Sequence, residues 1–177
     1  SSDFPTTPGA YQTTFPSVAW PYPPILVCSK IDAPDHVFGV SAFGSGAPGC
    51  AGEHHFTANS VPKSGNAQFR FLCTRAPANA LGLALVSTAK NLSTPDPLGL
   101  SIPLHLDLAA SELYALDFLS DAWGNADCLA PIPTNPALVG NHYYAQVLWV
   151  WPTASCSPFP STYGLSTAWG LDFVVQP

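Results

Sequence analysis

The sequence predicts an all-β fold, an antiparallel β-sandwich or jelly roll preceded by an extended N-terminal arm rich in proline and aromatic residues. Three observations predict it. Several short segments alternate apolar and polar residues, the side-chain period of a strand with one buried face. No segment keeps the i, i+3, i+4, i+7 spacing of an amphipathic helix over three turns. The 177 residues include 20 Pro and 13 Gly, which supply turns between short strands.

The chain divides near residue 43 into an arm, 1–42, and a sandwich domain, 43–177. Seven of the first 34 residues are Pro, a density that excludes helix and central strand and leaves extended backbone. An extended segment cannot bury large rings within itself, so we expect the arm's aromatic residues to pack on its own domain or on a neighbouring molecule. These residues are Phe4, Tyr11, Phe15, Trp20 and Tyr22.

Beyond a Gly-rich turn at 43–50, the pattern predicts a series of short strands. Segment 98–107 places Leu and Ile at every second residue, and Pro103 within it indicates an edge strand or a bulge. Segment 142–151 is apolar on both faces, so we expect it to be central and covered on both sides, with the arm as one candidate cover. The full set of expected strands is 67–74, 81–86, 98–107, 112–118, 142–151 and 169–175.

The composition excludes two classes of partner. Only 9% of the residues are charged, and the net charge of −6 includes just five Lys and Arg, which do not cluster. Binding to nucleic acid or to an anionic membrane surface requires clustered basic residues. No apolar run approaches the roughly 20 residues that span a bilayer.

The cysteines and the N-terminus indicate export. The sequence begins Ser1-Ser2 and contains no Met, as expected after removal of a signal peptide. Widely spaced cysteines without a CxxC pair favour disulfides over a metal site or a thioredoxin motif. Two bridges and one free thiol can be arranged in many ways, so the pairing stays open. The candidates are Cys28, Cys50, Cys73, Cys128 and Cys156.

Several runs resemble a poorly characterised secreted domain of exported proteins from planctomycetes and myxobacteria. They are 44–50, 64–69, 76–83, and Pro131-Ile-Pro-Thr-Asn-Pro-Ala-Leu-Val-Gly140 followed by Tyr143-Tyr-Ala-Gln146. The resemblance covers about residues 43–177 and implies export and a β-sandwich. It brings no catalytic residues. The aromatic arm and the Trp149–Trp151 pair depart from the usual texture of that family.

Two clusters could bind metal ions. In Glu53-His54-His55 the adjacent His side chains of a strand point to opposite faces, so we expect no metal site there. Asp117, Asp121, Asn125 and Asp127 could supply oxygen ligands to Ca²⁺, but they lack the alternating pattern of a dedicated loop. We favour a tight turn at 121–125, with Gly124 and Asn125 at positive φ.

The sequence favours a binding or structural role over catalysis. It has no nucleophile elbow, no Cys–His motif and no HExxH motif, so we expect no enzyme and no cofactor. A carboxylate pair that includes Glu53 and Glu112 remains a weaker alternative, as in glycoside hydrolysis.

Aromatic side chains could also form a platform that stacks on sugar rings, although core packing is the alternative for the Trp149–Trp151 pair. The platform candidates are Trp20, Tyr22, Trp123, Trp149, Trp151, Tyr163 and Trp169.

The leading hypothesis is an extracellular structural subunit that self-assembles into a filament or surface lattice. In this hypothesis the arm of one copy docks on the sandwich of the next by strand addition. The alternative is a carbohydrate-binding module at the cell surface.

Overall fold

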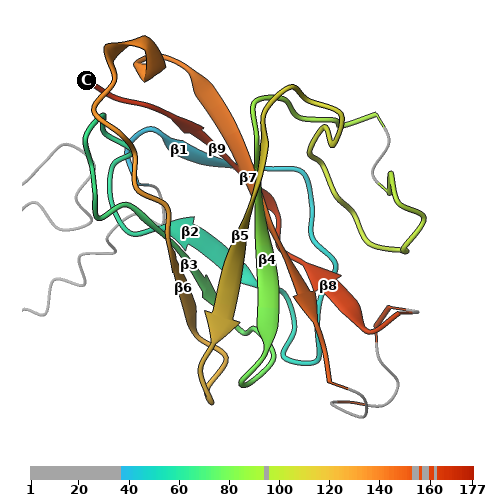
Figure 1. Ribbon diagram of the computed structural model, residues 1–177. Helices are drawn as coiled ribbons and strands as arrows, with labels where there is room; N and C mark the ends of the chain where they lie inside the picture. Colours follow the sequence, from blue (N-terminus) through green and yellow to red (C-terminus); the bar gives the residue numbers. More distant parts are fainter. Residues whose placement is uncertain (1–36, 94–95, 153–155, 157–159, 162) are drawn as a thin grey trace, which may run out of the picture. The chain divides into compact units, whose positions relative to one another are not determined.

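The computed structural model describes residues 37–177, apart from 94–95, 153–155, 157–159 and 162 (Figure 1). The chain divides into two units, Ser1–Asp32 and Ala33–Pro177, and all described residues belong to the second. The five aromatic residues of the predicted arm, together with Cys28, lie outside the described residues.

The described residues form an all-β, antiparallel fold, as the sequence predicts, with one short 3₁₀ turn and no α-helix. The strand order is β1-β9-β7-β4-β5-β6-β3-β2, with β8 paired to β7. The strands are β1 (Val40–Phe43), β2 (His55–Ala58), β3 (Arg70–Thr74), β4 (Leu81–Ser87), β5 (Leu113–Ser120), β6 (Ala126–Leu129), β7 (His142–Val150), β8 (Leu165–Thr167) and β9 (Gly170–Val174); the 3₁₀ turn η1 is Pro136–Leu138.

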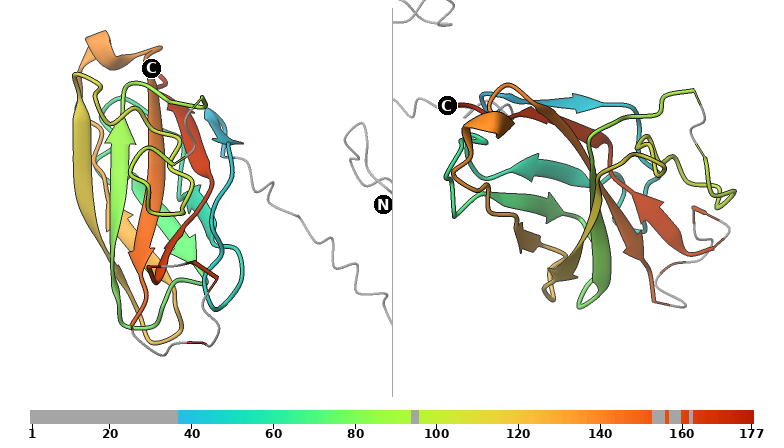
Figure 2. Two further views of the ribbon diagram at one scale, coloured as in Figure 1. Left: turned by 90° about the vertical axis from the view of Figure 1, so that its right-hand side faces the viewer. Right: turned by 45° about the horizontal axis from the view of Figure 1, so that its top comes forward.

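These strands belong to one sheet that curls until its two walls face each other across the core (Figure 2). The sheet nearly closes, because β2 at one end of the order lies close to β9 near the other end. The indole Nε1 of Trp169 donates a hydrogen bond of 3.0 Å to the Phe56 carbonyl and ties the two ends together.

The core is a cluster of aromatic rings contributed by both walls. Phe56 packs on Phe71 with ring centroids 5.5 Å apart, and Phe118 packs on Trp149 at 5.6 Å. All four side chains are at most 1% exposed. Burying a large apolar side chain stabilises the fold by roughly 1.5–3 kcal/mol, so these rings hold the two walls together.

The central position predicted for segment 142–151 is confirmed in β7, His142–Val150, whereas the expected cover on both faces is incomplete, because Val150 is exposed. The strand pairs with β4 on one side and with β9 and β8 on the other. Its inward residues Ala145, Val147 and Trp149 are fully buried. The interpretation of Trp149 and Trp151 as core residues is therefore confirmed.

The predicted strand at 98–107 is wrong, although its apolar pattern is real. Ile102, Leu104 and Leu106 are buried at every second residue, yet the segment joins a ladder only through an isolated Lys90–Leu106 bridge. Hydrogen bonds from side chains replace the backbone hydrogen bonds that a neighbouring strand would provide. The Pro103 carbonyl accepts hydrogen bonds from Gln146 and Thr167, so this loop covers the outer face of β7.

Candidate functional site

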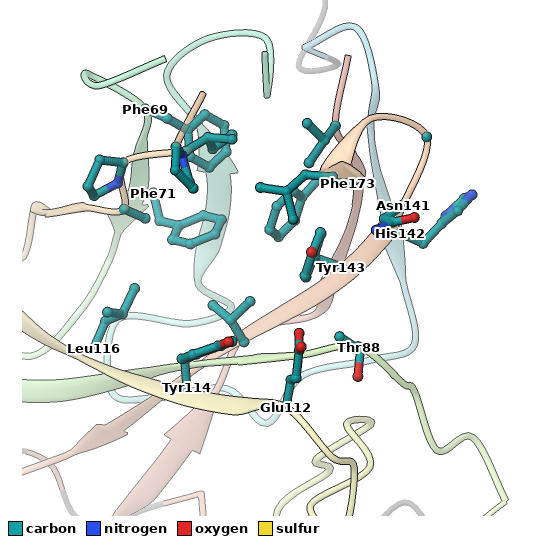
Figure 3. Close-up of a pocket in the computed structure, with 18 of the residues that line it drawn as sticks. Phe69, Phe71, Thr88, Glu112, Tyr114, Leu116, Asn141, His142, Tyr143 and Phe173 are labelled. Carbon is teal, nitrogen blue, oxygen red and sulfur yellow. The ribbon is translucent and has the colours of Figure 1, made fainter. Parts of the chain in front are cut away.

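A large apolar pocket opens at one end of the curled sheet (Figure 3). Its volume is about 980 Å³, at the upper end of the range of ligand sites. Phe69, Phe71 and Phe173 form one side, and Tyr114 and Leu116 of β5 form the other (Figure 3). The pocket can therefore accept a large apolar group between two aromatic walls.

The rim of this pocket is polar. Glu112 and His142 lie on it, and the imidazole Nδ1 of His142 is 2.8 Å from a carboxylate oxygen of Asp172. Tyr143 stacks on Phe173 with ring centroids 5.6 Å apart. An apolar interior with a polar rim suits an amphipathic occupant, such as a peptide segment with alternating side chains.

The β5 wall of the pocket has an unpaired backbone edge. Ser120 and Glu112 bond to the β4 side, at Ala80 and Thr88, so the even-numbered residues of β5 point their backbone groups toward β4. The odd-numbered residues point toward β6. In the described chain β6 pairs with β5 only at Leu119 and Ser120. The backbone groups of three odd residues therefore face an open gap: Leu113, Ala115 and Asp117.

Two prolines explain why the ladder stops. If the register of Leu119 with Asp127 continued, Ala115 would lie opposite Pro131 and Leu113 opposite Pro133. Proline has no backbone N–H and cannot complete such a ladder. The chain instead bonds toward β3, through the N–H of Ala130 to the Phe69 carbonyl. From the turn at 121–125 the two strands diverge (Figure 1).

The exposed side chains of β5 are unusually apolar for a strand with an open edge. Tyr114 is 54% exposed in the pocket, and Leu113 is also exposed. Natural proteins protect such edges with charge, proline or a covering segment, because they add strands from other chains. This edge carries one charged residue, Asp117, at its far end.

The first described strand, β1, belongs to the same wall of the sheet as the pocket-lining strand β9. Val40 in β1 pairs with Phe173 in β9, and Phe173 lines the pocket. The sheet already includes Val40–Phe43, so the last residues of the predicted arm, 1–42, are a strand of the body.

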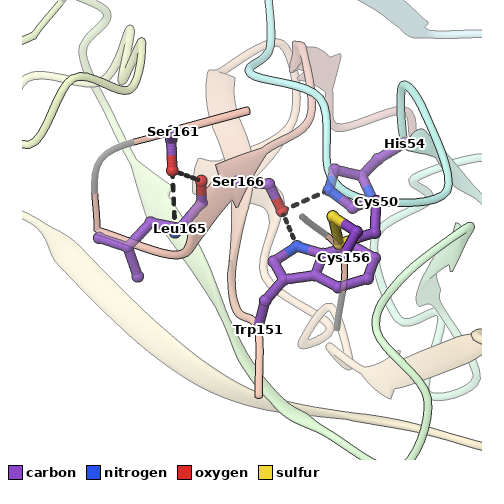
Figure 4. Close-up of a disulfide and its surroundings, with 7 residues drawn as sticks. All are labelled: Cys50, His54, Trp151, Cys156, Ser161, Leu165 and Ser166. Atoms are coloured by element: carbon purple, nitrogen blue, oxygen red, sulfur yellow. Dashed lines mark hydrogen bonds between the residues drawn. A yellow bond between two sulfur atoms is a disulfide. The ribbon is translucent and has the colours of Figure 1, made fainter. Parts of the chain in front are cut away.

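Figure 4 shows a buried polar network beside the disulfide that no sequence pattern indicated. One of its residues, His54, also lines a second, smaller pocket. The Ser166 hydroxyl oxygen lies 2.6 Å from Nε2 of His54 and accepts a hydrogen bond of 2.6 Å from the Trp151 indole. The Ser166 hydroxyl therefore links the His54 and Trp151 rings. Burial lowers the pKa of His54 from 6.5 to about 4, and the nearby Arg75 carbonyl offsets only part of this shift.

The Ser166–His54 pair has the contact of a nucleophile with its base, but its surroundings differ from those of a catalytic dyad. Ser166 is fully buried, and it does not line the adjacent pocket. Catalysis requires a nucleophile that meets its substrate. We interpret the pair as a structural network next to the disulfide.

The Cys50–Cys156 disulfide is one of the bridges that the sequence allows. It joins the loop before β2 to the loop after β7, 106 residues apart in sequence. Cys73 and Cys128 are buried free thiols, and burial raises the pKa of the Cys73 thiol to about 12. A thiol with so high a pKa is unreactive at neutral pH.

The Asp121–Asn125 segment is the tight turn that we favoured over a calcium site. The Asp121 backbone N–H bonds to the Asn125 carbonyl, and the Asp121 carboxylate accepts from the Trp123 and Asn125 N–H groups. These backbone donors lower the pKa of Asp121. Gly124 has a φ of 75°, whereas Asn125 does not take the expected positive φ.

The other candidate groups are dispersed. Glu112 lines the large pocket and Glu53 the small one, so the two do not form a carboxylate pair. His54 is buried, whereas His55 packs against Trp169. Nowhere in the described part of the chain do three His, Cys, Asp or Glu side chains gather to hold a metal ion.

Trp20 and Tyr22 of the platform candidates lie outside the described residues, and only some of the other five are exposed. Trp123 is 84% exposed and Tyr163 is exposed, whereas Trp149 and Trp151 are buried. Among the described residues, no helix has the length and apolar character needed to span a membrane.

In comparisons with known proteins, no family model, no curated protein and no solved structure matches this chain. The fold and the site define only a class, a nearly closed antiparallel β protein with an apolar pocket beside an open strand edge.

Proposed function

We propose that this protein is an extracellular structural subunit, in which the N-terminal arm of one copy docks in the pocket of a neighbouring copy. The observation that carries the proposal is the unpaired edge of β5 beside an apolar pocket of about 980 Å³. An extended segment added there gains main-chain hydrogen bonds from the edge and buries apolar side chains in the pocket.

The arm is the occupant that the chain itself supplies. Thirty-six residues precede the described part, and they carry five large aromatic side chains with no expected core of their own. They join the body at a strand paired with the pocket-lining β9. Docking from copy to copy is head-to-tail and does not close on itself, so it produces a filament or lattice.

An extracellular location is part of this proposal. The Cys50–Cys156 disulfide supports it, because such bonds persist in oxidising compartments. The low content of charged residues is also compatible with a role in a packed surface layer.

Light scattering on the full-length protein tests the proposal. Two variants should each abolish large species: replacement of the five arm aromatics by Ser, and Tyr114→Glu in the pocket. The matched control is Leu81→Glu, an outward-facing β4 residue of similar exposure (58%), which should still assemble.

Mixing the two assembly-defective variants gives a sharper outcome. One retains an intact pocket and the other an intact arm, so the mixture should form one-to-one pairs and stop. Two results would overturn the proposal: unchanged large species in both variants, or a wild-type protein that stays monomeric at all concentrations.

A second candidate function is carbohydrate binding, and the exposed Trp123 ring favours it. An exposed indole held on a rigid turn can stack on a sugar ring. Binding on a glycan array that disappears in Trp123→Ala would support this function. An array with no binding by the wild type would exclude it for the glycans present.

A further inference from the structure

We infer that residues 25–31 of the arm are the strand that pairs with β5 of the neighbouring copy. The inference rests on the proposed function and names the segment that performs it. Within residues 1–36 the longest run without proline is 25–33, bounded by Pro24 and Pro34. Only such a run keeps every backbone N–H available for a ladder.

The composition of this run suits a strand. Residues 25–31 read Ile-Leu-Val-Cys-Ser-Lys-Ile, with β-branched residues at 25, 27 and 31. Seven residues of strand extend about 23 Å at 3.3 Å per residue, enough to cover the free edge from Leu113 to Asp117.

The alternation of side chains fixes which face enters the pocket. Ile25, Val27 and Ile31 share one face of a strand, and Lys30 lies on the other. The apolar face matches the pocket walls of Phe71 and Phe173. The opposite orientation would bury the charged Lys30 ammonium among aromatic rings, which is unfavourable without a paired charge.

The far side of the gap also fits an inserted strand. In the continued register Pro131 faces the gap with its carbonyl and has no N–H of its own. An added strand would receive both donors and acceptors from β5 and a further acceptor from Pro131. The central residue Cys28 would then point outward beside Ala115, the central residue of the free edge.

Substitutions at neighbouring positions of the full-length chain test this assignment, because successive side chains of a strand point to opposite faces. Val27→Asp and Ile31→Asp should remove the large species in light scattering, because they place a carboxylate in the pocket. Leu26→Asp and Cys28→Asp should retain them, because these positions face outward.

Cross-linking provides a second measurement. A chain with Ala115→Cys and Cys28→Ser is mixed with the wild type and oxidised with copper phenanthroline, which takes up the two thiol electrons. We expect a disulfide-linked dimer between residue 115 and Cys28 of the other chain. The control is Leu81→Cys with Cys28→Ser, equally outward-facing on β4, and it should give no dimer.

The results separate the two ideas. If Val27→Asp still assembles while the five-aromatic variant does not, another segment such as 9–15 is the strand; the inference is overturned and the proposed function stands. If no arm variant changes the size of the species, the proposed function itself fails. A third chain, Ala115→Cys with Cys28 retained, holds both thiols; if it cross-links only within one chain, the arm lies on its own body, which would contradict both.

Discussion

At the scale of single residues, His54 gives the clearest link between burial, pKa and the stability of the fold. The ring is 1% exposed, and its Nε2 lies 2.6 Å from the Ser166 hydroxyl oxygen. Its pKa of about 4 in the folded protein lies below the value of 6.5 for an unburied imidazole. Protonation therefore favours the unfolded chain.

The pH dependence of stability follows from this shift. The contribution of the neutral, buried His54 ring to the free energy of unfolding is fully present above pH 6.5. It falls as the pH drops from 6.5 to 4 and is lost below pH 4. Urea unfolding at pH 7 and pH 4.5 should show that the wild type loses roughly 2–3 kcal/mol more than His54→Gln over this interval. Equal losses in the two proteins would show that His54 does not titrate as a buried neutral ring.

One further contact between two residues shows why the surroundings of Trp151 were not predictable. A Cβ on Gly49 would lie 2.1 Å from the Trp151 ring, so only glycine fits beside this buried indole. The contact joins residues 102 positions apart in the chain. Neither the alternation of a single segment nor its composition contains information on such a contact.

At the scale of elements, the alternation of apolar residues predicted the strands with one buried face and the central position of β7. The same rule failed at 98–107. The inward residues there are buried as the pattern requires, but Gln146 and Thr167 bond the Pro103 carbonyl in place of a neighbouring strand. Alternation of apolar residues indicates which side chains are buried. It does not indicate which groups form hydrogen bonds with the backbone of the segment.

The open edge of β5 was visible in the sequence only in part. Pro131 and Pro133 indicate that their segment cannot be a central strand. Whether these prolines leave the edge of β5 unpaired depends on the register that places Leu119 opposite Asp127. The pocket is lined by residues of five separate strands and of the loop after β6, so no single sequence motif predicts it.

The short strands β1, β2 and β8 were not predicted, since each has only three or four residues. Alternation over so few residues is weak evidence against irregular structure. Their positions are set by pairing with the longer strands, which is a property of the whole sheet.

At the scale of the whole molecule, the described sheet nearly closes: its terminal strands β1 and β2 are not paired with each other, and the ladder between β5 and β6 covers only Leu119 and Ser120. The aromatic core and the Cys50–Cys156 bond hold the rest together, so the gap between β5 and β6 is a local feature of an otherwise well-packed body. An apolar open edge of this kind promotes uncontrolled association unless a specific segment fills it. A dedicated arm would convert that tendency into ordered assembly.

The central claim is that a strand from another copy pairs with β5, and hydrogen exchange with single-residue resolution tests it most directly. The wild-type chain is compared in dilute monomeric form and in the assembled state. We expect the amides of Leu113, Ala115 and Asp117 to exchange freely in the monomer and to become protected in the assembly, because only they face the gap. The amides of Tyr114, Leu116 and Phe118, bonded to β4, should be protected in both. Odd-numbered amides that exchange at the same rate in the two states would contradict the account.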